Sequence, residues 1–219
     1  MDQIANLLSL TLFFVSLFIS VRAFYLYIQA RSRRIFILAL SMGVIALTAV
    51  AGYAGDNVTS ISLNVDWFNY IGQTVSFIFI LLSFFRNSDE YLRSLMRWHI
   101  TVSVLLLVLL FLAPVLPPEF PAPAVTKSIL SGSRGFICFI IFFYYINTFM
   151  GKETRFSLLM SLAFLLLCLG YSIIIPKYVT PNDVLDQSGD MIRIVGLVVL
   201  LLAVLLPEGA PQRYANKGI

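Results

Sequence analysis

Seven long apolar stretches constrain this chain more than any other feature of its sequence. They are expected as helices over about 4–29, 35–54, 66–85, 99–116, 127–150, 155–175 and 187–206. A membrane-spanning helix needs about 20 mostly apolar residues, so each stretch is long enough to cross a bilayer. The sequence therefore predicts an all-α membrane protein, folded as one seven-transmembrane helix bundle over residues 1–219.

Composition agrees with this class. Only 12% of the 219 residues are charged, against about 25% in soluble domains. The connections between the apolar stretches are short, so no separate catalytic or output domain is expected. The net charge of +4 is small and spread along the chain, which argues against a nucleic-acid partner. The lipid bilayer is the first expected partner.

The basic residues alternate between the two ends of the predicted bundle. Ten fall in the first, third and fifth connections and the tail, namely Arg31, Arg33, Arg34, Arg86, Arg93, Arg97, Lys152, Arg155, Arg213 and Lys217. The other end has only Lys127 and Lys177. The positive-inside rule then predicts an outside N-terminus and a cytoplasmic C-terminus. The chain has no eukaryotic targeting signal, so we expect the inner membrane of a bacterium.

The connection from Arg86 to Trp98 has two interpretations. Its apolar residues share a helical face, which is typical of a short helix lying in the inner interface. In that case the 86–98 segment would offer a docking surface to a membrane or cytoplasmic protein. Alternatively, the segment is a solvated extension of the fourth helix. His99, which follows it, is expected as an interface residue at the inner end of that helix.

The sequence contains no pattern typical of an enzyme or a metalloprotein. It has no HExxH motif, no Cys/His cluster, no glycine-rich phosphate loop and no nucleophile paired with a base. A haem between helices usually takes two axial ligands, and His99 is the only histidine. We therefore expect no catalytic residue, no metal and no cofactor.

Helices one to three resemble helices five to seven in the residues near their ends. The paired positions are Gly52-Tyr53 with Gly170-Tyr171, Asp66 with Asp190, Asn69 with Arg193, and Gly72 with Gly196. One interpretation is a 3+1+3 internal repeat with the fourth helix as linker, as in transporters whose sites lie at the repeat interface. The alternative is chance, because glycine, tyrosine and aspartate are common at helix ends.

Polar groups inside three predicted helices lie at similar depth. At 1.5 Å per residue, Gln73, Arg134 and Arg193 each lie about 9–10 Å inward from the outer end of their helix. A charge inside a spanning helix costs several kcal/mol, so each needs a partner or a wet cavity. The common depth predicts one polar layer in the outer half of the bundle.

We interpret this layer as an outward-open pocket in which two guanidinium groups hold an anionic group through paired hydrogen bonds. The predicted ligand-binding residues are Arg134, Arg193, Asp190, Asp66, Asn69, Gln73, Tyr70, Tyr53 and Tyr171. The alternative is a structural network, in which Asp66 and Asp190 neutralise the two arginines and join the helices.

The chain also resembles the membrane-associated seven-helix sensor domains of bacteria. The resemblance lies in the basic junction 31–34, in apolar helices that end in Gly-Tyr, and in a last helix that opens Asp190-x-x-Arg193. It implies sensing of outer or membrane-borne cues. Only twelve residues follow Pro207, so such a sensor is expected to signal through a separate protein.

The predicted function is therefore that of a non-enzymatic, receptor-like or sensor-like multi-pass membrane protein with a pocket for a small anionic or lipid ligand. Two alternatives stay open. One is an accessory or structural subunit of a larger membrane complex, and the other is a small-solute transporter with parallel three-helix repeats.

Overall fold

Helices make up nearly all of the described molecule. The computed structural model describes residues 2–57, 65–112, 115, 123–178 and 183–206. Its elements are α1 (Asp2–Ala30), α2 (Arg33–Asn57), α3 (Asp66–Phe85), α4 (Asp89–Leu112), α5 (Ala124–Lys152), α6 (Arg155–Ile174), the 3-10 helix η2 (Ile175–Tyr178) and α7 (Asp183–Leu205). Within these ranges, seven helices are long and apolar enough to cross a membrane. The prediction of a helical multi-pass membrane protein is confirmed, whereas its orientation and its membrane stay predictions.

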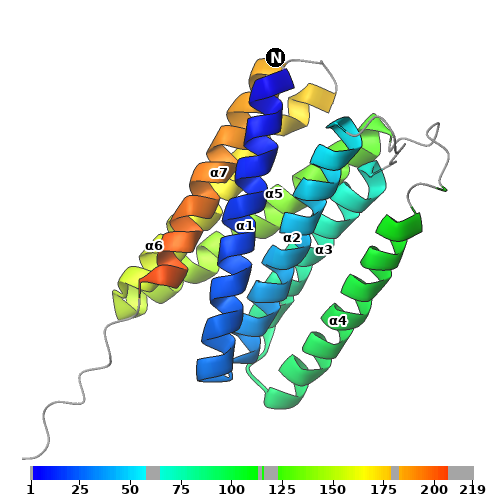
Figure 1. Ribbon diagram of the computed structural model, residues 1–219. Helices are drawn as coiled ribbons and strands as arrows, with labels where there is room; N and C mark the ends of the chain where they lie inside the picture. The colour runs from blue at the N-terminus through cyan, green and yellow to red at the C-terminus, as the bar shows by residue number, and fades with distance from the viewer. Residues whose placement is uncertain (1, 58–64, 113–114, 116–122, 179–182, 207–219) are drawn as a thin grey trace, which may run out of the picture.

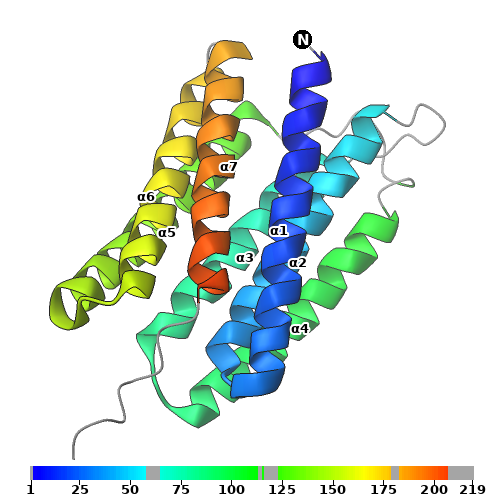
Figure 2. The same ribbon diagram turned by 60° about the vertical axis from the view of Figure 1, so that its left-hand side comes forward.

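Six of the helices close into a ring. Each of α1, α2, α3, α5, α6 and α7 packs against the next in that order, and α7 packs back against α1. The remaining long helix, α4, lies outside the ring against α2 and α3 (Figures 1 and 2). The ring is therefore closed by two junctions between helices distant in sequence, α3 with α5 and α7 with α1.

The largest apolar core fills the inside of this ring. Every ring helix contributes fully buried side chains to it, among them Ile19, Met42, Phe77, Ile141, Phe164 and Leu200. In contrast, α4 joins two smaller clusters through Leu106 and through Leu92 with Leu95. Because α4 takes no part in the main core, a site inside the bundle is built from the ring helices.

The fourth helix begins ten residues earlier than its hydropathy indicates. Its first turn carries Asp89 and Glu90, whose charges favour a helix N-terminus, and the Ser88 hydroxyl accepts the backbone N–H of Tyr91 at 3.3 Å. The 86–98 segment is thus largely continuous with the spanning helix, as the second interpretation holds. Arg93 and Arg97 interrupt the apolar run, which is why hydropathy placed the start near residue 99.

His99 does not lie at an interface as expected. It is 1% exposed and stacks on Phe79 with ring centroids 4.2 Å apart. Neither ring nitrogen has a hydrogen-bond partner within the described ranges. The early start of α4 explains the difference, because it places His99 almost three turns inside the helix, on the face that Leu92 and Leu95 also turn toward α2 and α3.

The junctions α1–α2 and α3–α4 meet at one end of the bundle. Arg33 pairs with Asp89 at 2.5 Å, while Arg34 donates to the Ser83 carbonyl at 3.0 Å and to the Asn87 side chain. The α5–α6 junction lies at this same end (Figure 2). Basic residues of three connections thus gather at one end, which is the arrangement that the positive-inside argument requires.

Candidate functional site

Gln73 is the centre of the polar layer. Its side-chain oxygen accepts a hydrogen bond from Nη1 of Arg134 and another from the Tyr171 hydroxyl at 3.4 Å. Its amide nitrogen donates to Oγ1 of Thr48 at 3.2 Å. Because these partners come from α5, α6 and α2, one amide on α3 links four ring helices.

Arg134 is buried, and the groups that hold its guanidinium are neutral. It is 3% exposed, and its Nε donates to the Leu130 carbonyl at 3.2 Å. Its guanidinium carbon lies 5.3 Å from the ring centroid of Tyr70 and 4.7 Å from that of Tyr171. Among the side chains that the structure describes, no carboxylate pairs with it. Its positive charge is held by an amide, a carbonyl and two aromatic rings.

Arg193 has a carboxylate partner on its own helix. It pairs with Asp190 one turn earlier on α7, and its guanidinium carbon lies 5.0 Å from the Tyr171 ring. The Nε atom is buried, and no described residue accepts a hydrogen bond from it. Arg134 and Arg193 therefore meet over one tyrosine ring, although only Arg193 has a counter-charge among the described side chains.

The close approach of α6 and α7 positions Arg193. Its stem packs over Gly170, where an added Cβ would lie 2.5 Å from Cγ of Arg193 and 2.9 Å from the Gly189 carbonyl oxygen. A helix pair can pack this closely only where side chains are small. The two facing glycines thus set how far the arginine reaches from α7 into the bundle.

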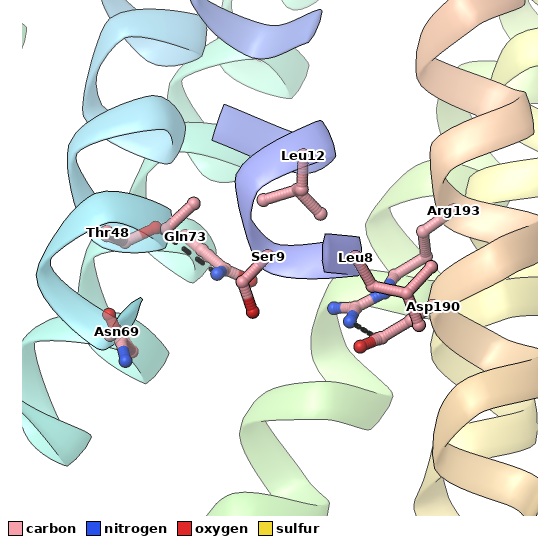
Figure 3. A pocket seen from close by; sticks show the side chains of 10 residues that line it. Leu8, Ser9, Leu12, Thr48, Asn69, Gln73, Asp190 and Arg193 are labelled. Carbon is pink, nitrogen blue, oxygen red and sulfur yellow. Dashed lines mark hydrogen bonds and ion pairs between the residues drawn. The ribbon is translucent and has the colours of Figure 1, made fainter. Parts of the chain in front are cut away.

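A cavity of about 170 Å³ opens beside this layer (Figure 3). It is lined by Leu8, Ser9 and Leu12 of α1, Thr48, Ala49 and Gly52 of α2, Asn69 and Gln73 of α3, and Asp190 and Arg193 of α7. Figure 3 shows the Asp190–Arg193 pair on one side of the cavity and Gln73, Thr48 and Asn69 on the other. One water occupies about 30 Å³ of liquid, so the space suits a few waters or one small ion.

A second polar group lies nearer the end of the bundle where α5 begins. The hydroxyls of Tyr70 and Tyr178 are 3.1 Å apart, and the Lys127 ammonium lies 5.5 Å from the Tyr70 ring centroid. Beside them Lys177 pairs with Asp186. Tyr70 therefore connects this group to Arg134, one layer deeper.

The structure brings most of the predicted residues together, with different roles. Asn69, Gln73, Asp190 and Arg193 line the cavity. Arg134, Tyr171 and Tyr70 do not line it; Arg134 contacts both tyrosine rings behind Gln73. Tyr53 is half-buried near the end of α2 and is not among the lining residues. The Asp66 side chain lies outside the part of the molecule that the structure describes, so its proposed pairing stays a prediction.

Sequence reasoning missed the contribution of α1 to the cavity, and on α2 it named Tyr53 instead of the lining residues Thr48, Ala49 and Gly52. Ser9 and Thr48 are small polar residues inside apolar helices, and that was the available signal. Thr48 also donates to the Ile45 carbonyl at 2.7 Å, the usual way for a hydroxyl to be satisfied inside a helix. Within the described ranges, no group of three or more His, Cys, Asp or Glu residues could hold a metal ion.

Comparisons with models of protein families, with curated proteins and with solved structures found no match. The resemblance to bacterial sensor domains therefore stays a prediction, and the function rests on the geometry of the site.

Proposed function

We propose that this protein is a non-enzymatic, receptor-like multi-pass membrane protein whose cavity binds a small anion. One observation carries the proposal. The polar layer holds two guanidinium groups but only one carboxylate among the described side chains. In a low-dielectric interior an uncompensated positive charge strongly attracts an anion.

The geometry of the cavity limits the size and the chemical class of the ligand. Arg193 and Asn69 line it, and each carries a buried polar atom, Nε and Oδ1 respectively, that has no hydrogen-bond partner among the described residues. The Asn69 amide can present its nitrogen instead by a simple flip. The volume lies below the 300–1,000 Å³ of pockets for larger ligands. A carboxylate or phosphate group of a few heavy atoms fits this space.

Arg134 acts in this proposal as a positioning residue rather than a contact. It does not line the cavity, but it holds the oxygen of Gln73, which turns the amide nitrogen of Gln73 toward Thr48 at the cavity wall. Its charge adds to the potential in the cavity without touching the ligand.

Substitutions in the Asp190–Arg193 pair test the proposal with opposite signs. We expect acetate or phosphate, titrated at constant ionic strength in chloride, to raise the unfolding temperature of the protein in lipid nanodiscs. Arg193→Gln removes the contacting charge and should abolish the shift. Asp190→Asn removes the competing carboxylate and should tighten anion binding about tenfold, the equivalent of about 1.4 kcal/mol.

The control for this experiment is Arg97→Gln, which removes an exposed arginine from the opposite end of the bundle and should leave the titration unchanged. If Asp190→Asn abolishes the response, the cavity binds cations and the proposal is wrong. An unchanged response in Arg193→Gln would equally exclude an anion site in this cavity.

A second candidate, a transporter built from parallel three-helix repeats, is favoured by one observation. In the α2–α3 pair, the Asn69 amide packs 3.1 Å from the place of a Cβ on Gly52. In the α6–α7 pair, Arg193 packs in the same way over Gly170. The predicted internal repeat pairs these same positions. The ring order α1–α2–α3–α5–α6–α7 is compatible with a two-fold axis that relates the first three helices to the last three.

Flux separates the two candidates. Proteoliposomes are incubated with radiolabelled acetate or phosphate, and uptake is compared with that of Arg193→Gln. A transporter should give uptake that falls to the protein-free level in the variant. Binding without uptake supports the receptor-like function, and a second protein retained in equimolar amount in mild detergent would instead favour an accessory subunit.

A further inference from the structure

A groove between α1 and α7 contains an arginine that the polar layer does not use. The groove has a volume of about 430 Å³ and is lined by Phe18, Val21, Arg22 and Tyr25 of α1 and by Leu201 and Leu205 of α7. Phe18 and Val21 are 62% and 58% exposed. The groove thus opens on the outside of the ring, where a spanning protein meets lipid.

Arg22 has no counter-charge among the side chains that the structure describes. Its Nε atom is buried and has no hydrogen-bond partner in the described part of the chain, and its guanidinium carbon lies 5.4 Å from the ring centroid of Tyr25. No described carboxylate forms an ion pair with it. A charged donor in apolar surroundings is strongly unfavourable without an acceptor, so a ligand that supplies one is favoured.

The position of Arg22 along the helix matches the level of lipid headgroups. Leu205, the last residue of α7, lines the same groove, so Arg22 lies near the end of the spanning part of the bundle. The 29 residues of α1 measure about 43 Å, more than the roughly 30 Å hydrocarbon core. Arg22 lies eight residues, about 12 Å, before the end of α1, within reach of the phosphates by snorkelling.

We propose that this groove binds an anionic phospholipid. The phosphate accepts hydrogen bonds from the Arg22 guanidinium, which suits phosphate because it can donate two parallel bonds. One acyl chain lies along Phe18, Val21 and Leu201. The lipid then contacts both helices of the α7–α1 junction, which closes the ring, and it stabilises that junction from outside.

Lipid composition tests the site directly. The protein is reconstituted in nanodiscs of phosphatidylcholine alone or with added phosphatidylglycerol, and we measure its unfolding temperature and the phosphatidylglycerol retained in native mass spectrometry. We expect phosphatidylglycerol to raise the unfolding temperature of the unsubstituted protein. Arg22→Gln should remove this difference and lower the retained lipid about tenfold, because a charge-assisted hydrogen bond is lost.

Two further variants make the result unambiguous. Arg97→Gln, which removes an exposed arginine at the same end of the bundle, should keep both responses. Leu205→Trp fills the groove while keeping Arg22, and it should lower lipid retention even if Arg22→Gln does not fold.

An alternative role for Arg22 is to stabilise the C-terminal end of α7 through the helix dipole. In that case Arg22→Gln lowers stability equally in both lipid mixtures, and that result overturns the proposal. Unchanged retention of phosphatidylglycerol in Leu205→Trp also overturns it.

Discussion

Replacing Gly170 by alanine is expected to lower the free energy of unfolding by about 2 kcal/mol, as overpacking of a tight interface typically does. Helix preference alone would predict the opposite sign, because alanine is the better helix former by about 1 kcal/mol. A loss of stability would therefore show that packing decides the effect. An added Cβ would lie 2.9 Å from the Gly189 carbonyl oxygen and 3.1 Å from the Arg193 backbone nitrogen. Since backbone atoms cannot rotate away, α6 and α7 must separate.

The same substitution should also weaken the site. The new methyl group would lie 2.5 Å from Cγ of Arg193, so the guanidinium must leave its place over Tyr171. We therefore expect Gly170→Ala to reduce the acetate- or phosphate-induced stabilisation as well as basal stability. Both are measured by thermal unfolding in nanodiscs, with and without the anion.

Two matched variants show whether the close approach is the cause. Gly189→Ala should destabilise to a similar degree, because its Cβ would lie 3.0 Å from the Gly170 carbonyl oxygen and would overlap the Ile174 side chain. Gly151→Ala, at the end of α5, meets nothing within 4 Å and should be neutral or slightly stabilising, because only the helix preference changes. Equal stability of the Gly170 and Gly151 variants would show that α6 and α7 have room to adjust.

The spanning helices could be predicted from the sequence, because in lipid the apolar run itself is the structural signal. α3 begins and ends where its hydropathy indicates, at Asp66 and Phe85. α4 differs because its first turns carry charges on an exposed side while Leu92 and Leu95 pack on Ile37 and Phe79. A hydropathy average over consecutive residues combines the exposed and the buried face, so it could not locate the first residue of α4.

The sequence predicted how deep in the bundle the polar layer lies, but it did not predict the contacts within the layer. Counting residues along α3, α5 and α7 placed Gln73, Arg134 and Arg193 at one level, and Gln73 does bond to Arg134. The order of helices around the ring was not predictable from spacing. For that reason the sequence could not indicate that α1 would line the cavity, or that Arg134 would be held behind Gln73 instead of facing the ligand.

The largest effect inside the layer is expected for Gln73→Leu. This change removes the acceptor of Nη1 of Arg134, a residue that is 3% exposed, and leaves the guanidinium only its bond from Nε to the Leu130 carbonyl. Leaving a buried charged donor unsatisfied costs about 3 kcal/mol. Arg134→Met should cost only about 1 kcal/mol, because it leaves a neutral amide whose oxygen still accepts from Tyr171.

The double variant Gln73→Leu/Arg134→Met should be more stable than Gln73→Leu alone, since an arginine in a spanning helix is itself unfavourable. Replacing both partners by apolar groups of similar shape is nearly neutral. With the double variant nearly neutral, the double-mutant cycle should give a coupling energy of about 4 kcal/mol, measured by equilibrium unfolding in detergent. Ser133→Ala, next to Arg134 but bonded only to the Leu130 carbonyl in its own helix, is the control and should change stability by less than about 0.5 kcal/mol.

The double-mutant cycle also distinguishes an anion-binding site from a network that only joins the helices. If Arg134 only joins helices, the double variant should recover both its stability and its response to anions. If Arg134 supplies potential to the cavity, stability should recover while anion binding stays weakened. Additive effects of the two substitutions would mean that Gln73 and Arg134 do not depend on each other, and the central role assigned to Gln73 would then be wrong.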